Sequence, residues 1–199
     1  MQGKRLLAAA LSGIVLLSVA TSAFAVMSVP YGWYVEGNVG STNLSNKSYP
    51  GSSSSSGIGG GGNVGYKFMP YFALEAGYTQ YANTSIKDNT GTKAGTDKHY
   101  SYDLAGKGIL PIVDSGVELF AKLGFGRVNS HVTINSDTAA SNIGLSSSSH
   151  TAGGLFYGGG IQYYVMPELA VNAQWEQAQG SSSTGNVALL SAGISFIVD

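Results

Sequence analysis

The amino-acid sequence predicts an all-β fold, a closed antiparallel up-and-down barrel of eight strands, from three observations. Apolar and polar side chains alternate with a period of two through most of residues 32–198, as in strands with two unlike faces. Short turns alternate with longer polar connections along this range. Only 11% of the residues are charged, whereas the chain has 29 glycines and 12 tyrosines. So few charges suit a chain whose outside faces lipid, and a sheet crosses lipid only as a closed barrel.

A secretory signal peptide is predicted at residues 1–25. Lys4 and Arg5 precede a long apolar stretch, and cleavage after Ala25 follows a small-x-small pattern. The alternative is a membrane helix, but the apolar stretch is shorter than the roughly 20 residues that span a bilayer. Residues 26–199 are then expected to form one barrel domain. This domain lacks cysteine and has no basic footprint for a nucleic acid.

The strongest strand signal is a hairpin within residues 153–179, which turns at Met166-Pro167-Glu168. One face of the hairpin carries large apolar and aromatic side chains, and the other carries glycine, amides and charge. The apolar face comprises Leu155, Tyr157, Gly159, Ile161, Tyr163, Val165, Leu169, Val171, Ala173 and Trp175. We expect this face to meet lipid.

Six further strands with the same two kinds of face are expected. They cover residues 32–40, 57–68, 71–81, 98–110, 117–129 and 185–198. The turns near Pro70, Pro111 and Pro167 are short. The predicted polar loops cover residues 41–56, 82–97, 130–150 and 179–184. Antiparallel strands therefore gather all short turns at one end of the barrel and all loops at the other. Aromatic side chains near the strand ends, Tyr81 among them, suggest belts at the two membrane surfaces.

A secreted soluble barrel of the lipocalin type is the alternative, with its apolar face inside. Eight inner faces of Leu, Tyr and Phe would overfill so small a barrel. Packing of Leu155, Ile161 and Val171 at the centre of the molecule would contradict the membrane prediction.

Short motifs follow one another in a fixed order between residues 65 and 196. They are Gly65-Tyr66-Lys67, Pro70-Tyr71, Glu75-Ala76-Gly77-Tyr78, Lys107, Pro111-Ile112, Lys122-Leu123-Gly124, Gly159-Gly160-Ile161-Gln162-Tyr163, Pro167-Glu168, Gln174-Trp175 and Ala192-Gly193-Ile194-Ser195-Phe196. In this order and spacing they resemble the membrane domain of the outer membrane protein A family. The resemblance implies a bacterial outer-membrane barrel with periplasmic termini and loops at the cell surface. Members usually continue into a peptidoglycan-binding domain, and since this chain stops at Asp199 we expect that function to be absent.

The resemblance also implies a gate of charges inside the barrel. The family's acid matches Glu75 and one of its bases matches Lys107, but its other acid appears here as Gln162 and its other arginine as Asn172. This departure argues against gating of the family type.

Strand alternation by itself places three acids and three bases inside the barrel. Besides Glu75 and Lys107, they are Glu36, Asp103, Lys67 and Lys122. A charge in a narrow interior needs a partner, because its desolvation costs several kcal/mol. Glu75 and Lys107, on adjacent strands, are the expected pair. We expect the charges to plug the lumen, since eight-stranded barrels have room only for side chains. A narrow ion path is the alternative.

A glycine pattern and three histidines do not predict a binding or catalytic site. Residues 60–65 match a dinucleotide-binding glycine pattern, but they enter a strand rather than a helix. His99, His131 and His150 lie near serines at the loop end, without a compact His-Ser group and a supporting acid. We therefore expect exposed loop histidines and no catalytic, cofactor-binding or metal-binding residues. An outer-membrane enzyme of the lipid A deacylase type is the alternative.

The sequence thus predicts a non-enzymatic, surface-exposed outer-membrane barrel, with a lipid-modifying enzyme and a narrow ion-conducting porin as alternatives. The expected partners are outer-membrane lipids and lipopolysaccharide, and the barrel-assembly machinery during insertion. A host or cell-surface ligand is expected at loops 41–56, 82–97 and 130–150, and no nucleic acid is expected.

Overall fold

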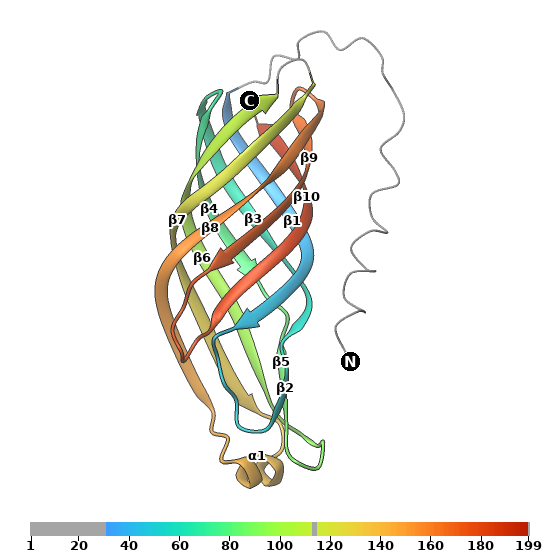
Figure 1. Cartoon of the computed structure of the whole chain (residues 1–199), viewed down its shortest axis with the longest axis vertical. Coiled ribbons are helices and arrows are strands. Elements are labelled where there is room, and N and C mark those ends of the chain that lie inside the picture. Colours follow the sequence, from blue (N-terminus) through green and yellow to red (C-terminus); the bar gives the residue numbers. More distant parts are fainter. Residues whose placement is uncertain (1–30, 113–114, 199) are drawn as a thin grey trace, which may run out of the picture.

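The computed structural model describes residues 31–112 and 115–198, which form a tall barrel of tilted antiparallel strands (Figure 1). Eight strands make the wall: β1 Gly32–Ser45, β3 Ser56–Met69, β4 Phe72–Gln80, β6 Lys93–Ile112, β7 Val117–Ile134, β8 Ser148–Met166, β9 Leu169–Ala178 and β10 Asn186–Val198. Each wall strand pairs with the next in the chain, and β10 pairs with β1. Every strand of the ring therefore has partners on both sides, as lipid requires. The predicted eight-stranded up-and-down barrel is confirmed, and the predicted signal peptide lies outside the described residues.

The apolar face of the wall points outward. Leu155, Ile161 and Val171 have exposed fractions of 39%, 45% and 43%, so they do not pack at the centre of the molecule. On the opposite face, charged side chains such as Glu75 and Lys107 are buried. This arrangement is the reverse of a soluble barrel, and it matches an outside that meets hydrocarbon.

Aromatic side chains form two belts on the outer face. At the short-turn end Tyr66 packs edge-to-face against Trp33, with 5.2 Å between the ring centroids. Toward the loop end Tyr78 lies 5.2 Å from Tyr102, and on the far hairpin Tyr157 packs against Trp175. Such belts mark the bilayer interfaces. Tyr81 was wrongly assigned to a belt: it points into the barrel and is buried.

The sheet continues past the belt nearest the loops, toward the end of the barrel that lies at the bottom of Figure 1, where loops were predicted. We call this belt the loop-end belt. The β6–β7 ladder reaches the pair Gly95 and Ile134, and the β7–β8 ladder reaches Ser148. The predicted loops at 41–56, 82–97 and 130–150 were therefore wrong over much of their length, since β1 also reaches Ser45 and β3 begins at Ser56. Outside the membrane the outward face of a strand meets water instead of lipid, so the apolar alternation that marks a membrane strand fades while backbone pairing continues.

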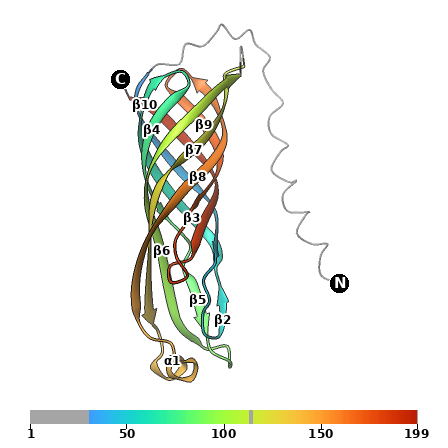
Figure 2. The same cartoon turned by 60° about the vertical axis from the view of Figure 1, so that its left-hand side comes forward.

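Three short elements lie at the loop end of the barrel (Figures 1 and 2). They are β2 Ser52–Ser54, β5 Thr84–Lys87 and α1 Asp137–Ile143. β5 pairs with β6, and β2 pairs with β5, so they extend the wall as a small outer flap. The helix begins after Ser136, whose side chain accepts a hydrogen bond from the Ala139 N–H, and it ends at Gly144 with φ of 67°. In the described part of the chain no helix has the length and hydropathy needed to span a bilayer.

Candidate functional site

The centre of the lumen holds a group of four buried charges from four strands. Lys107 Nζ lies 3.0 Å from Glu75 Oε1 and 3.7 Å from Glu36 Oε2. Lys122 Nζ lies 2.8 Å from Glu75 Oε2 and 3.5 Å from Glu36 Oε1. The expected pair of Glu75 and Lys107 is thus one side of a group in which each ammonium bridges both carboxylates. We call these four residues the central charge group.

Neutral side chains also donate hydrogen bonds to the two carboxylates. The Tyr34 hydroxyl donates to Glu75 Oε1 at 2.6 Å. Glu36 Oε1 accepts hydrogen bonds from three amides, of Asn38 at 2.8 Å, Asn63 at 2.9 Å and Gln174 at 3.1 Å. Buried carboxylates need such donors, because the ion pairs alone leave lone pairs unsatisfied.

A second polar group lies nearer the short turns. Lys67 Nζ is 2.9 Å from Glu118 Oε1, and the Gln162 amide donates to Glu118 Oε2 at 2.6 Å and to the Tyr164 hydroxyl at 3.0 Å. Gln162, which stands where the family resemblance implied an acid, therefore serves here as a donor to a different acid. A carboxylate at this position would repel Glu118.

The expected balance of three acids and three bases was wrong. Glu118 and Glu176 are also buried inside, so five acids face three bases in the membrane section of the lumen. The Glu176 carboxylate lies 3.8 Å from Lys122 Nζ. The alternation along β7 that places Lys122 inside also places Glu118 inside. The alternation along β9 puts Glu176 on the same face as Gln174, so the sequence indicated an inward position for both acids.

Two of the expected lumen residues stay outside these groups. Asp103 is half-buried, and no lysine or arginine of the described chain lies within ion-pair distance of it. Asn172 is buried, and neither atom of its amide has a hydrogen-bond partner among the described residues. Gly77 makes room at this level, because a Cβ there would collide with the side-chain oxygens of Asn63 and Asp103.

Apolar layers separate the polar groups and fill the remaining lumen. The inward face of β7 reads Glu118, Phe120, Lys122, Gly124, Gly126, Val128 and Ser130, with charge and apolar bulk alternating. Phe156 packs at the level of Gly126 with other buried apolar side chains of the loop-end half. The gap beside Lys67 and Tyr164 has a volume of about 10 Å³, which is room for about one water molecule. Polar groups and apolar layers thus alternate along the described interior.

A third buried polar group lies beyond the loop-end belt and ties the loop between β1 and β2 to the wall. Lys47 Nζ is 2.5 Å from Asp97 Oδ2, and the Tyr49 hydroxyl donates to the same oxygen at 2.7 Å. The Ser130 hydroxyl, on β7, donates to Asp97 Oδ1 at 2.9 Å. We call Lys47, Tyr49, Asp97 and Ser130 the loop latch. Burial opposes ionisation of Asp97, but the Lys47 ammonium, His99 and the Tyr49 hydroxyl outweigh it and hold the pKa of Asp97 below its ordinary value.

The expectation of exposed histidines was wrong for His99, which is buried with Nε2 3.4 Å from Asp97 Oδ2. Burial, reinforced by the Lys47 ammonium, lowers the pKa of His99 despite the nearby carboxylate, so its imidazole is neutral at pH 7. His131 and His150 are exposed. Ser130 donates to Asp97 rather than to His99, so these residues lack the serine-to-histidine contact of a nucleophilic triad. Within residues 31–112 and 115–198 no cluster of His, Asp and Glu is arranged to hold a metal.

Comparison with known proteins identifies the family. Residues 9–196 match the family model described as outer membrane protein beta-barrel domain. The chain belongs to this family. The family supports a location in the bacterial outer membrane, and the predicted likeness to outer membrane protein A is confirmed. Comparison with curated proteins gave no match.

Solved structures share the fold at low sequence identity. Outer membrane protein OprG from Pseudomonas aeruginosa has a TM-score of 0.65 at 14% identity, covering 87% of this chain and 100% of that one. Neisserial surface protein A has a TM-score of 0.56 at 20% identity, with 84% and 97% covered. The attachment invasion locus protein Ail of Yersinia pestis, in complex with the heparin analogue sucrose octasulfate, has a TM-score of 0.51 at 14% identity, with 83% and 98% covered. Such identities indicate a common barrel fold alone.

Proposed function

We propose that this protein is a non-enzymatic surface protein whose plugged barrel anchors a ligand-binding structure at the loop end. The length of three wall strands carries the proposal. β6, β7 and β8 have 20, 18 and 19 residues, whereas β4 and β9 have 9 and 10. A membrane crossing needs about 9–11 residues. Nearly half of each long strand therefore stands beyond the bilayer, where it serves no anchoring purpose.

The order of the loop end supports binding there. The loop latch, the flap of β2 and β5 and the capped helix α1 hold connections that a simple anchor would leave as short turns. A pre-organised surface loses less conformational entropy when it binds a ligand. Ail, a relative in fold, was crystallised with a heparin analogue, which makes a host-surface ligand a reasonable first target.

The proposed orientation puts the loop end outside the cell and the short turns in the periplasm. We would insert one protease site after Ser141, in α1, and the same site after Glu168, in the turn between β8 and β9. Protease added to intact cells should cut the first variant, and it should cut the second only after the outer membrane is permeabilised. The reverse pattern would contradict the orientation.

Binding itself is tested by replacing residues 136–147 with a short Gly-Ser turn. Cells that express the replaced protein should adhere to host-cell layers several-fold less than cells that express the natural chain, because the helix and its flanks are gone. The variant with the insertion after Glu168 is the control and should adhere normally. Equal adhesion of all three would contradict binding through this loop.

The plugged interior supports an anchor rather than a porin. In planar bilayers the purified protein should show no steady open pore, because charge groups and apolar layers fill the lumen. A stable large conductance would contradict the plug. A lipid-modifying enzyme is disfavoured by the contacts of Ser130 and His99, and overexpression should leave the mass of lipid A unchanged.

A further inference from the structure

We propose that the outer face of β6 and β7, at the edge of the hydrocarbon nearest the loop end, binds the phosphate group of an anionic membrane lipid. Three exposed basic side chains make this site, which we call the cationic ladder: Lys98, Arg127 and His131. The inference rests on the membrane placement of the barrel and not on adhesion, so either proposal can fail without the other.

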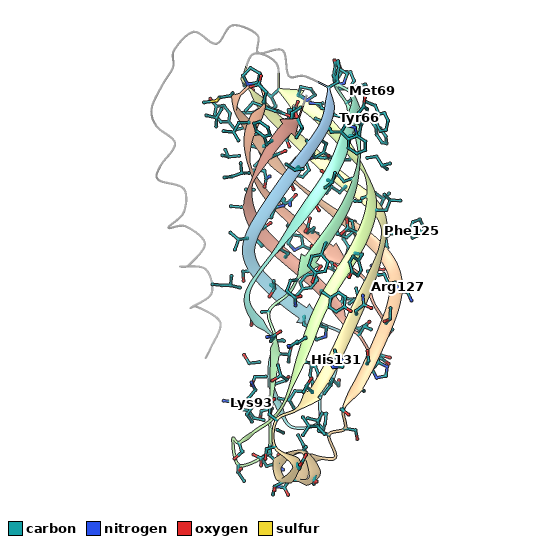
Figure 3. The ribbon with its side chains drawn as sticks, turned by 180° about the vertical axis from the view of Figure 1, so that it is seen from behind. Tyr66, Met69, Lys93, Phe125, Arg127 and His131 are labelled. Atoms are coloured by element: carbon teal, nitrogen blue, oxygen red, sulfur yellow. The ribbon has the colours of Figure 1, made fainter. Side chains whose placement is uncertain are left out.

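The ladder begins where the apolar surface ends. Along β7 the outward residues Leu123 and Phe125 are 63% and 78% exposed, and the next three outward positions are Arg127, Asn129 and His131. Figure 3 shows Phe125, Arg127 and His131 following one another along the strand. A ligand at this height meets apolar surface on one side and positive charge on the other. The acyl chains of an anionic lipid match the first, and its phosphate matches the second.

The strand register pairs two of the three basic groups, and Arg127 lies four residues from His131 along β7, about 13 Å at 3.3 Å per residue. Lys98 on β6 is the direct partner of His131 on β7, and Tyr102 is the direct partner of Arg127. Side chains of directly opposed residues on one face lie about 5 Å apart at their Cβ atoms. Two basic groups at such a distance repel when both are protonated, and a bound anion removes that cost.

The lack of a carboxylate partner distinguishes these cations from the lysines that point into the barrel and from the lysine of the loop latch. Lys47, Lys67, Lys107 and Lys122 each form an ion pair with a buried carboxylate. Lys98 and Arg127 have no carboxylate within 4 Å in the described part of the chain. The acids of β6 and β7, which are Asp97, Asp103 and Glu118, all belong to the inward face. The face around the ladder is therefore positive and uncompensated.

The surroundings of Arg127 leave room for a headgroup. Its partner on β8 is Gly153, where an added Cβ would meet only the Gly126 carbonyl oxygen, at 3.8 Å. Tyr102 stands on the other side, on β6. The planar guanidinium favours bidentate contact with phosphate oxygens, and the open strip over Gly153 gives those oxygens access.

The test compares lipids that differ in the phosphate alone. Full-length protein in a neutral detergent would be titrated with phosphatidylglycerol and with diacylglycerol of the same acyl chains, with retention read by native mass spectrometry. We expect phosphatidylglycerol to be retained and diacylglycerol to be lost. Inorganic phosphate should compete only weakly, because it lacks the acyl chains that contact Phe125 and Leu123. Equal retention of the two lipids would overturn the proposal, as would full competition by inorganic phosphate or sucrose octasulfate.

The ladder variant K98Q/R127Q/H131Q should weaken phosphatidylglycerol binding roughly tenfold or more, because charge-assisted contacts are lost. The matched control is K87Q/K93Q, which removes two exposed lysines that pair with each other farther from the hydrocarbon edge. It should bind within about twofold of the natural protein. Heat-modifiable gel migration would verify that both variants fold. A control that loses as much binding, or a ladder variant that loses none, would overturn the proposal.

Discussion

The membrane half of the barrel and its loop-end half are built from the same strands but are held together differently. In the membrane half every side chain has one of two surroundings, lipid or a dry lumen, and charges such as Glu75 and Lys107 must neutralise one another. Beyond the loop-end belt water reaches the outer face, so the structure there depends on particular side-chain contacts. There one buried carboxylate, Asp97, gathers a lysine, a tyrosine and a serine from distant segments. The lumen groups therefore tie strands of the wall to one another, whereas the latch ties one loop to the wall.

The largest effect should come from the central charge group. Glu75→Leu removes a carboxylate that contacts two buried ammoniums, so we expect the free energy of unfolding to fall by about 3–5 kcal/mol. Unfolding in urea with detergent, followed by heat-modifiable migration, measures the change. The control is Leu123→Ala on the lipid-facing side, which should cost far less. Equal losses for the two variants would break the distinction between lumen and outer face.

The loop latch should show a smaller and local effect. Asp97→Asn removes the charge that binds Lys47, with an expected local cost of about 1.5–3 kcal/mol. Residues 46–51 should then be cut faster by protease, while the urea midpoint of the barrel changes little. Thr96→Ala on the outward face of the same strand serves as the control. A barrel that unfolds as readily as the Glu75→Leu variant would show that the two halves are not separable.

The latch should also respond to acid. The folded pKa of Asp97 lies below its ordinary value of 3.8, so its stabilisation is fully present above that pH. The stabilisation is lost as the pH falls from about 3.8 through the lower folded pKa. Protease protection of residues 46–51 should therefore persist at pH 5 and weaken near pH 3. An Asp97→Asn variant should lack this dependence, and an unchanged profile in that variant would assign it to another group.

The smallest effect is expected at α1. Ser136→Ala removes the side-chain cap on Ala139, which costs about 1 kcal/mol of helix stability. Amide hydrogen exchange at Ala139 should quicken several-fold, while the barrel keeps its urea midpoint. Ser141→Ala, in the same helix but without a capping role, should leave that exchange almost unchanged. Equal quickening in both variants would contradict the assignment of the cap.

The candidate sites were only partly accessible to sequence reasoning. The inward position of Glu75 follows from alternation, and the same rule would have placed Glu118 inside had it been applied along all of β7. The latch was not foreseeable, because Lys47 and Asp97 are 50 residues apart and neither belongs to a periodic membrane segment. His99 was misjudged for a different reason, since the predicted strand 98–110 already puts it on the same face as Lys107 and so indicated an inward position.

Periodicity along the chain is enough to predict the class of fold, the number of wall strands and the outward direction of side chains such as Leu155 and Ile161. Lipid imposes a strict period of two on any strand that crosses it, and that period can be read without coordinates. Only the tertiary structure decided which inward charges meet, how far the strands extend beyond the membrane and what holds the first loop. Those features depend on register and strand tilt, which bring residues from different strands to one level of the barrel.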